Sequence, residues 1–135
     1  MSGIRGKNTK PELLVRRALH TRGLRYRIHA RELPGKPDLV FPRHRAVLFV
    51  HGCFWHGHDC VLFRLPSTRP EFLQNKIDTN RRNDVRASDA LVAAGWRVGT
   101  VWECALRLRS RLPDEVAAEL ADWINSDRLH IEVRG

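Results

Sequence analysis

The densest group of chemically capable side chains lies in residues 51–60, His-Gly-Cys-Phe-Trp-His-Gly-His-Asp-Cys. This segment holds three of the seven histidines and two of the three cysteines of a 135-residue chain. Thiolates and imidazoles are preferred zinc ligands, so Cys53, His58, Cys60 and the distant Cys104 are suited to one structural ion. The spacing is not that of a standard zinc finger, and buried free thiols are the alternative. We favour zinc, because Cys104 ends an expected strand that can lie beside this segment.

Three further features carry candidate chemistry. His51 and His56 are left over by the zinc set. An imidazole with an ordinary pKa of about 6.5 is suited to act as a general base, although a histidine that only packs or forms hydrogen bonds is the more common case. Asp38 opens an expected strand and can bind Mg²⁺, although capping the turn after Pro37 is an equally good interpretation. The adjacent aromatic rings of Phe54 and Trp55 either fill a core or present stacking surfaces to bases.

The charge distribution indicates a polyanionic partner. The net charge is +9, and residues 1–45 carry all of it, with 12 basic and 3 acidic side chains against 12 of each in residues 46–135. Of the 24 basic residues 20 are arginine, whose planar fork matches phosphate. Nucleic acid is therefore the first expected partner and an anionic membrane surface the second, with a solvated basic face as the plain alternative.

Composition restricts the class of protein. Hydrophobic residues make up 42% of the chain, enough for a core, and no apolar run approaches the roughly 18 residues of a membrane span. The polar, basic start lacks the apolar region of a secretory signal, and three cysteines do not suggest a disulfide framework. We expect a single domain over residues 1–135, located in the cytoplasm.

Periodicity predicts an α/β domain that positions these residues. A helix is expected after Thr9, which forms a capping box with Glu12, and a second over residues 71–94, with a break near Thr79-Asn80. We expect the second helix to turn four apolar side chains inward: Phe72, Ile77, Val85 and Leu91. A third helix is expected over 113–125, and strands over 24–29, 38–41, 46–50, 97–102 and 129–133. Strands flanked by helices indicate a three-layer fold with a mixed sheet.

Six segments together resemble the very-short-patch-repair (Vsr) DNA mismatch endonucleases. They are residues 33–38 (Leu-Pro-Gly-Lys-Pro-Asp), 51–56 (His-Gly-Cys-Phe-Trp-His), 68–72, 80–84, 95–98 (Gly-Trp-Arg-Val) and 101–106 (Val-Trp-Glu-Cys-Ala-Leu). The likeness covers most of residues 1–126 in the same order, and the second and last segments are highly specific together.

The resemblance implies a restriction-endonuclease-like fold that uses Mg²⁺ and a structural zinc. It implies nicking on the 5′ side of the T in a T·G mismatch left by deamination of 5-methylcytosine. The matching positions are the Mg²⁺ ligands Asp38 and Val50 (through its carbonyl), the catalytic His56, and the supporting Glu12, His51 and Asp84. Cys53, His58, Cys60 and Cys104 match the four zinc ligands, and Phe54 and Trp55 match aromatic residues that wedge into the DNA.

Two departures from the family pattern affect recognition. Leu73 stands where the family can carry a third intercalating aromatic residue, and Met1 falls at or beside a minor-groove wedge position because the N-terminal segment is short. We therefore expect looser mismatch or context discrimination. T·G duplex is the expected partner of a monomeric bacterial enzyme, with mismatch-repair proteins as further candidates. A restriction-type enzyme for unmodified duplex and a non-catalytic zinc-stabilised DNA-binding module are the alternatives.

Overall fold

A five-stranded mixed sheet organises the chain. The structure, a computed structural model, describes residues 9–53, 56–58, 69–107 and 113–134. The strand order is β1-β2-β3-β4-β5, antiparallel over the first three strands and parallel over the last three. The strands are β1 Arg27–Ile28, β2 Leu39–Phe41, β3 Ala46–His51, β4 Arg97–Trp102 and β5 His130–Val133. This confirms the predicted mixed α/β class. Each expected strand is present: β4 has the expected bounds, β2, β3 and β5 differ by one residue, and β1 is shorter than expected.

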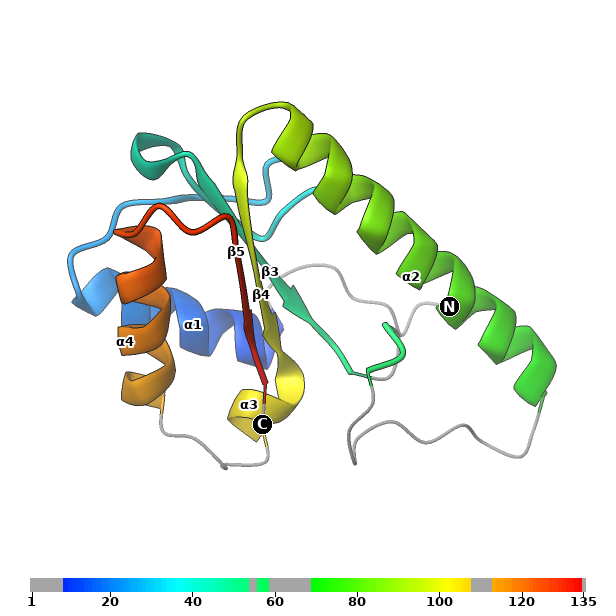
Figure 1. Ribbon diagram of the computed structural model, residues 1–135. Helices are drawn as coiled ribbons and strands as arrows, with labels where there is room; N and C mark the ends of the chain where they lie inside the picture. The colour runs from blue at the N-terminus through cyan, green and yellow to red at the C-terminus, as the bar shows by residue number, and fades with distance from the viewer. Residues whose placement is uncertain (1–8, 54–55, 59–68, 108–112, 135) are drawn as a thin grey trace.

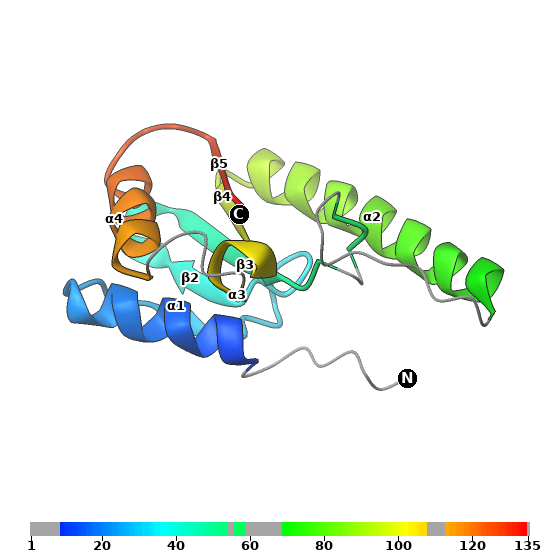
Figure 2. The same cartoon turned by 90° about the horizontal axis from the view of Figure 1, so that it is seen from below.

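Helices cover both faces of the sheet (Figures 1 and 2). They are α1 Lys10–Thr21, α2 Pro70–Ala93, the short α3 Glu103–Arg107 and α4 Pro113–Ile124, with a 3-10 turn over Pro42–His44. Side chains of a strand alternate between its faces. Leu48 of β3 accordingly packs in the cluster that includes Val15 of α1 and Leu120 of α4, whereas Val47 packs with Leu91 of α2. The sheet is therefore the middle layer of three.

The first helix begins as its sequence predicts. Thr9 is the N-cap, and its hydroxyl oxygen accepts a hydrogen bond from the Glu12 backbone N–H at 3.3 Å. The carboxylate of Glu12 is buried, and one of its oxygens lies 2.7 Å from Nε2 of His29. The cap thus fixes the helix start, and the helix directs an acidic side chain toward the sheet.

Two expectations for α2 are wrong. The helix runs unbroken through Thr79 and Asn80. These residue types lower helix stability by at most about 0.7 kcal/mol each, which is too little to end a helix. The Arg82 guanidinium also donates a hydrogen bond to the Thr79 hydroxyl. Ile77 is buried as expected, but Phe72 and Val85 are 49% and 61% exposed. Phe72 is in the first turn of α2, and Figure 1 shows that this end of the helix extends past the sheet. Val85, in the C-terminal half of the helix, lines an open cavity instead of a core.

Parallel pairing of β3 with β4 positions the functional segments. Their register aligns His51 with Trp102, so both strands end at the same edge of the sheet. The segment that starts at Gly52 follows one strand, and α3 with Cys104 follows the other. Residues about fifty positions apart in sequence therefore meet. Within the described ranges of the chain, no helix combines the length and apolar character that crossing a membrane requires.

Candidate active site and metal centre

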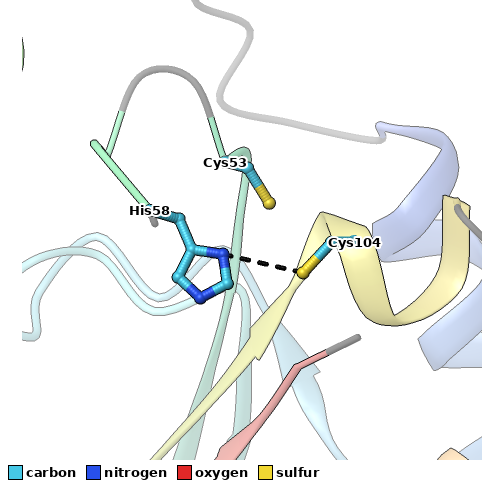
Figure 3. Close-up of side chains that lie close together, drawn as sticks. All are labelled: Cys53, His58 and Cys104. Carbon is cyan, nitrogen blue, oxygen red and sulfur yellow. Dashed lines mark hydrogen bonds between the residues drawn. The ribbon is translucent and has the colours of Figure 1, made fainter. Parts of the chain in front are cut away.

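Two cysteines and one histidine converge beyond the ends of β3 and β4 (Figure 3). One ligand atom from each of Cys53, His58 and Cys104 lies within 4.8 Å of the others. The Cys104 sulfur is 3.6 Å from Nδ1 of His58, and all three residues are buried. Two thiol groups and an imidazole are a donor set that fits zinc. Cys60, the fourth expected ligand, lies outside the described residues.

Neighbouring groups hold this Cys/His cluster in place. The backbone N–H of Cys53 donates to Oε1 of Glu103 at 3.2 Å, and the backbone N–H of His58 donates to the carbonyl of Cys53 at 2.9 Å. The His58 ring also stacks on the Trp102 ring, with centroids 4.0 Å apart and planes 5° from parallel. The segment after β3 is thus tied to both β4 and α3.

A second cluster consists of two histidines and an aspartate. Nδ1 of His56 lies 2.6 Å from Oδ2 of Asp84 on α2, and Nε2 of His51 lies 4.0 Å from the other carboxylate oxygen. The two imidazole rings stack with centroids 3.8 Å apart. Burial is the main reason why the pKa of His51 falls to about 3, with the nearby His56 contributing. His51 is therefore neutral at physiological pH.

A third cluster gathers around Asp38, at the start of β2. Its Oδ2 accepts a hydrogen bond from the Val50 backbone N–H at 2.7 Å, which joins the first residues of β2 to the end of β3. Burial raises the pKa of Asp38 to about 7, and the negative charge of Glu12 acts in the same direction. Buried carboxylates are costly to ionise unless a positive charge lies nearby. A divalent cation supplies that positive charge, so this group of residues fits one.

The second and third clusters share one cavity of about 1120 Å³. Its lining includes every described residue expected in the catalytic machinery: Glu12, Asp38, Val50, His51, His56 and Asp84. Exposed Arg31 and Lys36 also line it and provide positive charge for a phosphate backbone. Leu73 lies half-buried on α2, and the expected wedge residues Met1, Phe54 and Trp55 are outside the described residues.

Sequence reasoning assigned no role to three residues at these sites. His29 bonds to Glu12, Glu103 anchors Cys53, and Trp102 lies between the clusters, with its ring 4.0 Å from that of His58 and 5.3 Å from that of His51. The indole N–H of Trp102 donates to Glu132 of β5 at 2.6 Å. Trp102 and Glu103 belong to the segment 101–106 that carries the family resemblance, whereas no motif marked His29.

A cavity lined by carboxylates, imidazoles and cations is typical of a phosphodiester hydrolase. The profile of DNA mismatch endonuclease Vsr matches residues 1–62. Over 125 residues the chain is 46% identical to DNA mismatch endonuclease Vsr of Escherichia coli K12. The matched region covers 92% of this chain and 80% of that relative. The chain therefore belongs to the Vsr family of DNA mismatch endonucleases.

Other relatives, including the following two, bear the name of nicking enzymes. Type II nicking enzyme V.XorIIP of Xanthomonas oryzae pv. oryzae is 54% identical over 106 residues, 78% of each chain. Type II nicking enzyme V.NmeAIP of Neisseria meningitidis is 41% identical over 107 residues, 79% of this chain and 76% of the relative. The protein is thus a DNA endonuclease of the nicking type, and the alternative of a non-catalytic DNA-binding module is set aside.

Proposed function

We propose that this chain is a Mg²⁺-dependent enzyme that nicks duplex DNA on the 5′ side of the T in a T·G mismatch produced by deamination of 5-methylcytosine. The observation that carries the proposal is the shared cavity, where Asp38 and Glu12 face the pair formed by His56 and Asp84. The mismatch endonuclease among the relatives supports the same substrate. The proposal includes a restriction-endonuclease-like fold in a single domain over residues 1–135.

Asp38 and Val50 are the residues that would hold Mg²⁺. Carboxylate and carbonyl oxygens are the hard ligands this ion prefers, and the bond from the Val50 N–H to Asp38 places both residues side by side. A bound Mg²⁺ would supply positive charge that stabilises the phosphate and makes water a better nucleophile. His51 lines the same cavity and would orient water by hydrogen bonds, and Glu12 places a second carboxylate beside Asp38.

His56 is the proposed general base. Its Nδ1 is bonded to the Asp84 carboxylate, which favours the tautomer with a proton on Nδ1 and leaves Nε2 to accept a proton from water. The stacked His51 is neutral, so it does not oppose the positive charge that His56 gains. Asp84 compensates that charge directly. The arrangement thus places a carboxylate and an uncharged ring, rather than a second cation, beside the proposed base.

The Cys/His cluster has a structural role in this proposal. Cys53, His58, Cys60 and Cys104 would hold zinc, and His56 lies between two of these ligands in sequence. A closed zinc site fixes a loop that lacks regular structure, and catalytic placement demands that rigidity. Phe54 and Trp55 from the same segment, with Leu73 and Met1, would wedge into the duplex where a mismatch makes it easier to open.

Two substitutions test this function. His56→Ala and Asp38→Asn should each abolish Mg²⁺-dependent nicking of a T·G duplex, while binding to that duplex stays largely intact because the basic surface supplies most of the affinity. His20→Ala, at an exposed position on α1, is the matched control and should nick normally. Nicking by His56→Ala at the wild-type rate would contradict the assignment of the base.

A further inference from the structure

His29 is held beside the proposed magnesium ligand by the backbone. Its N–H donates to the Asp38 carbonyl at 3.1 Å, next to the antiparallel pairing of β1 with β2. His29 has a φ of +52°, a left-handed conformation that residues other than glycine adopt rarely. Such conformations persist where the surrounding structure enforces them, often at functional sites. The result is an imidazole directed toward the acidic wall of the cavity.

The side chain of His29 completes a compact group of potential ligands. Its Nε2 lies 2.7 Å from Oε2 of Glu12, and Arg16 approaches the same oxygen at 3.6 Å from the side of α1. Ligand atoms of Glu12, His29 and Asp38 all lie within 4.8 Å of one another. Glu12 is 1% exposed and His29 is 17% exposed, and all three residues line the cavity.

The chemistry of this group differs from that of a pure oxygen site. Mg²⁺ prefers carboxylates, carbonyls and water, whereas imidazole is a ligand suited to transition-metal ions. A site with one nitrogen and two carboxylates favours a transition-metal ion that also accepts oxygen ligands, and Mn²⁺ meets both conditions.

We propose that His29 is a further protein ligand of the ion, beside Asp38, the Val50 carbonyl and Glu12, and that this site therefore binds Mn²⁺ more tightly than Mg²⁺. The inference rests on the proposed metal-dependent function and deepens it by naming the ion the site selects. The competing role for His29 is to position Glu12 through the hydrogen bond alone. A positioning role places no nitrogen on the metal, so the two roles differ in a spectroscopic property.

Mn²⁺ binding to the zinc-loaded, DNA-free protein tests this inference. We expect electron paramagnetic resonance titration to give an affinity for Mn²⁺ at least about tenfold above that for Mg²⁺, measured by competition. Pulsed measurements should detect nitrogen coupling to Mn²⁺. His29→Asn should weaken Mn²⁺ binding about tenfold or more and remove the coupling. Asn tolerates the left-handed backbone, so this variant should keep its thermal unfolding midpoint, as should the control His20→Asn.

Each result decides the question. Nitrogen coupling and Mn²⁺ affinity that persist in His29→Asn would overturn the proposal, as would undetectable Mn²⁺ binding or equal affinity for both ions in the wild type. The proposed function has a different readout, the nicking of T·G duplex in Mg²⁺, so its failure can be told apart from the failure of the metal-ligand proposal. An enzyme that nicks T·G duplex yet shows no nitrogen coupling refutes the role of His29 and leaves the function standing.

Discussion

Nδ1 of His56 lies 2.6 Å from Oδ2 of Asp84, and this contact joins the segment after β3 to the middle of α2. The His56 ring is further held by stacking on His51, whose centroid is 3.8 Å away. A side chain fixed by a charged hydrogen bond and a parallel ring has little rotational freedom. The proposed base is therefore oriented before DNA binds, which reduces the cost of reaching the reactive geometry.

Removing the charge of Asp84 should lower the rate of nicking much more than the affinity for DNA. Asp84→Asn keeps the shape of the side chain but no longer stabilises a protonated His56, so we expect the single-turnover nicking rate to fall about 10²- to 10⁴-fold. Affinity for T·G duplex should change little. Asp89→Asn, an exposed change on the same helix, should nick at the wild-type rate. Equal losses in both variants would assign the effect to helix charge rather than to His56.

Loss of a Cys/His ligand should destabilise the fold. Cys104→Ala removes a buried thiol from the cluster, and we expect the purified variant to lack zinc and lose several kcal/mol in the free energy of unfolding. Glu103→Gln keeps an oxygen that accepts from the Cys53 N–H and should retain one zinc per chain. Metal analysis together with thermal unfolding measures both. Wild-type protein that is stable and free of zinc would rule out a structural ion.

The affinity for Mg²⁺ should depend on pH through Asp38. Burial raises the pKa of Asp38 to about 7, so below pH 7 the cation must displace a proton from its ligand. The Mg²⁺ concentration for half-maximal nicking should fall by up to about tenfold per pH unit from pH 5.5 to 7, then level off above pH 8. A half-maximal concentration that stays constant across this range would show that Asp38 is already ionised in the free enzyme.

Leu73→Trp should improve discrimination of the mismatch. Leu73 is half-buried on α2 beside the exposed Phe72, and stacking of an aromatic ring on a base contributes about 1–3 kcal/mol. We expect the ratio of affinities for T·G and matched duplex to rise at fixed salt concentration. Asp89→Trp adds the same ring elsewhere on α2 and should leave the ratio unchanged. An unaltered ratio in Leu73→Trp would mean that this position does not face the DNA.

Helices and strands marked by a pattern of neighbouring residues were predicted correctly. The apolar run 46–50 became the buried strand β3, and Thr9 caps α1 as its spacing with Glu12 indicates. The predicted break at Thr79-Asn80 was wrong because weak helix propensity does not end a helix with stabilising contacts on both sides. The inward positions predicted on α2 were wrong at Phe72, near the end of the helix that extends past the sheet, and at Val85, which lines the cavity. Periodicity describes one face of a helix but not what that face contacts.

The candidate site was recognisable from motifs, but its geometry depends on strand register. Cys53 and Cys104 meet because β3 and β4 pair in parallel with His51 opposite Trp102. His29 reaches Glu12 and Asp38 because of the pairing of β1 with β2 and a left-handed backbone at His29. No local pattern encodes these long-range relationships, which explains why His29 was missed while the residues within family motifs were named.

Specific nicking at a T·G mismatch is measured best with two DNA duplexes, one with the mismatch and one matched. Each carries randomised flanking bases and is labelled separately on both strands, so that the nicked strand is identified. We expect a single nick on the 5′ side of the T, dependent on Mg²⁺ and abolished by Asp38→Asn, with the matched duplex left essentially intact. Cleavage of the matched duplex at an equal rate, or Mg²⁺-independent nicking retained by Asp38→Asn, would contradict this expectation.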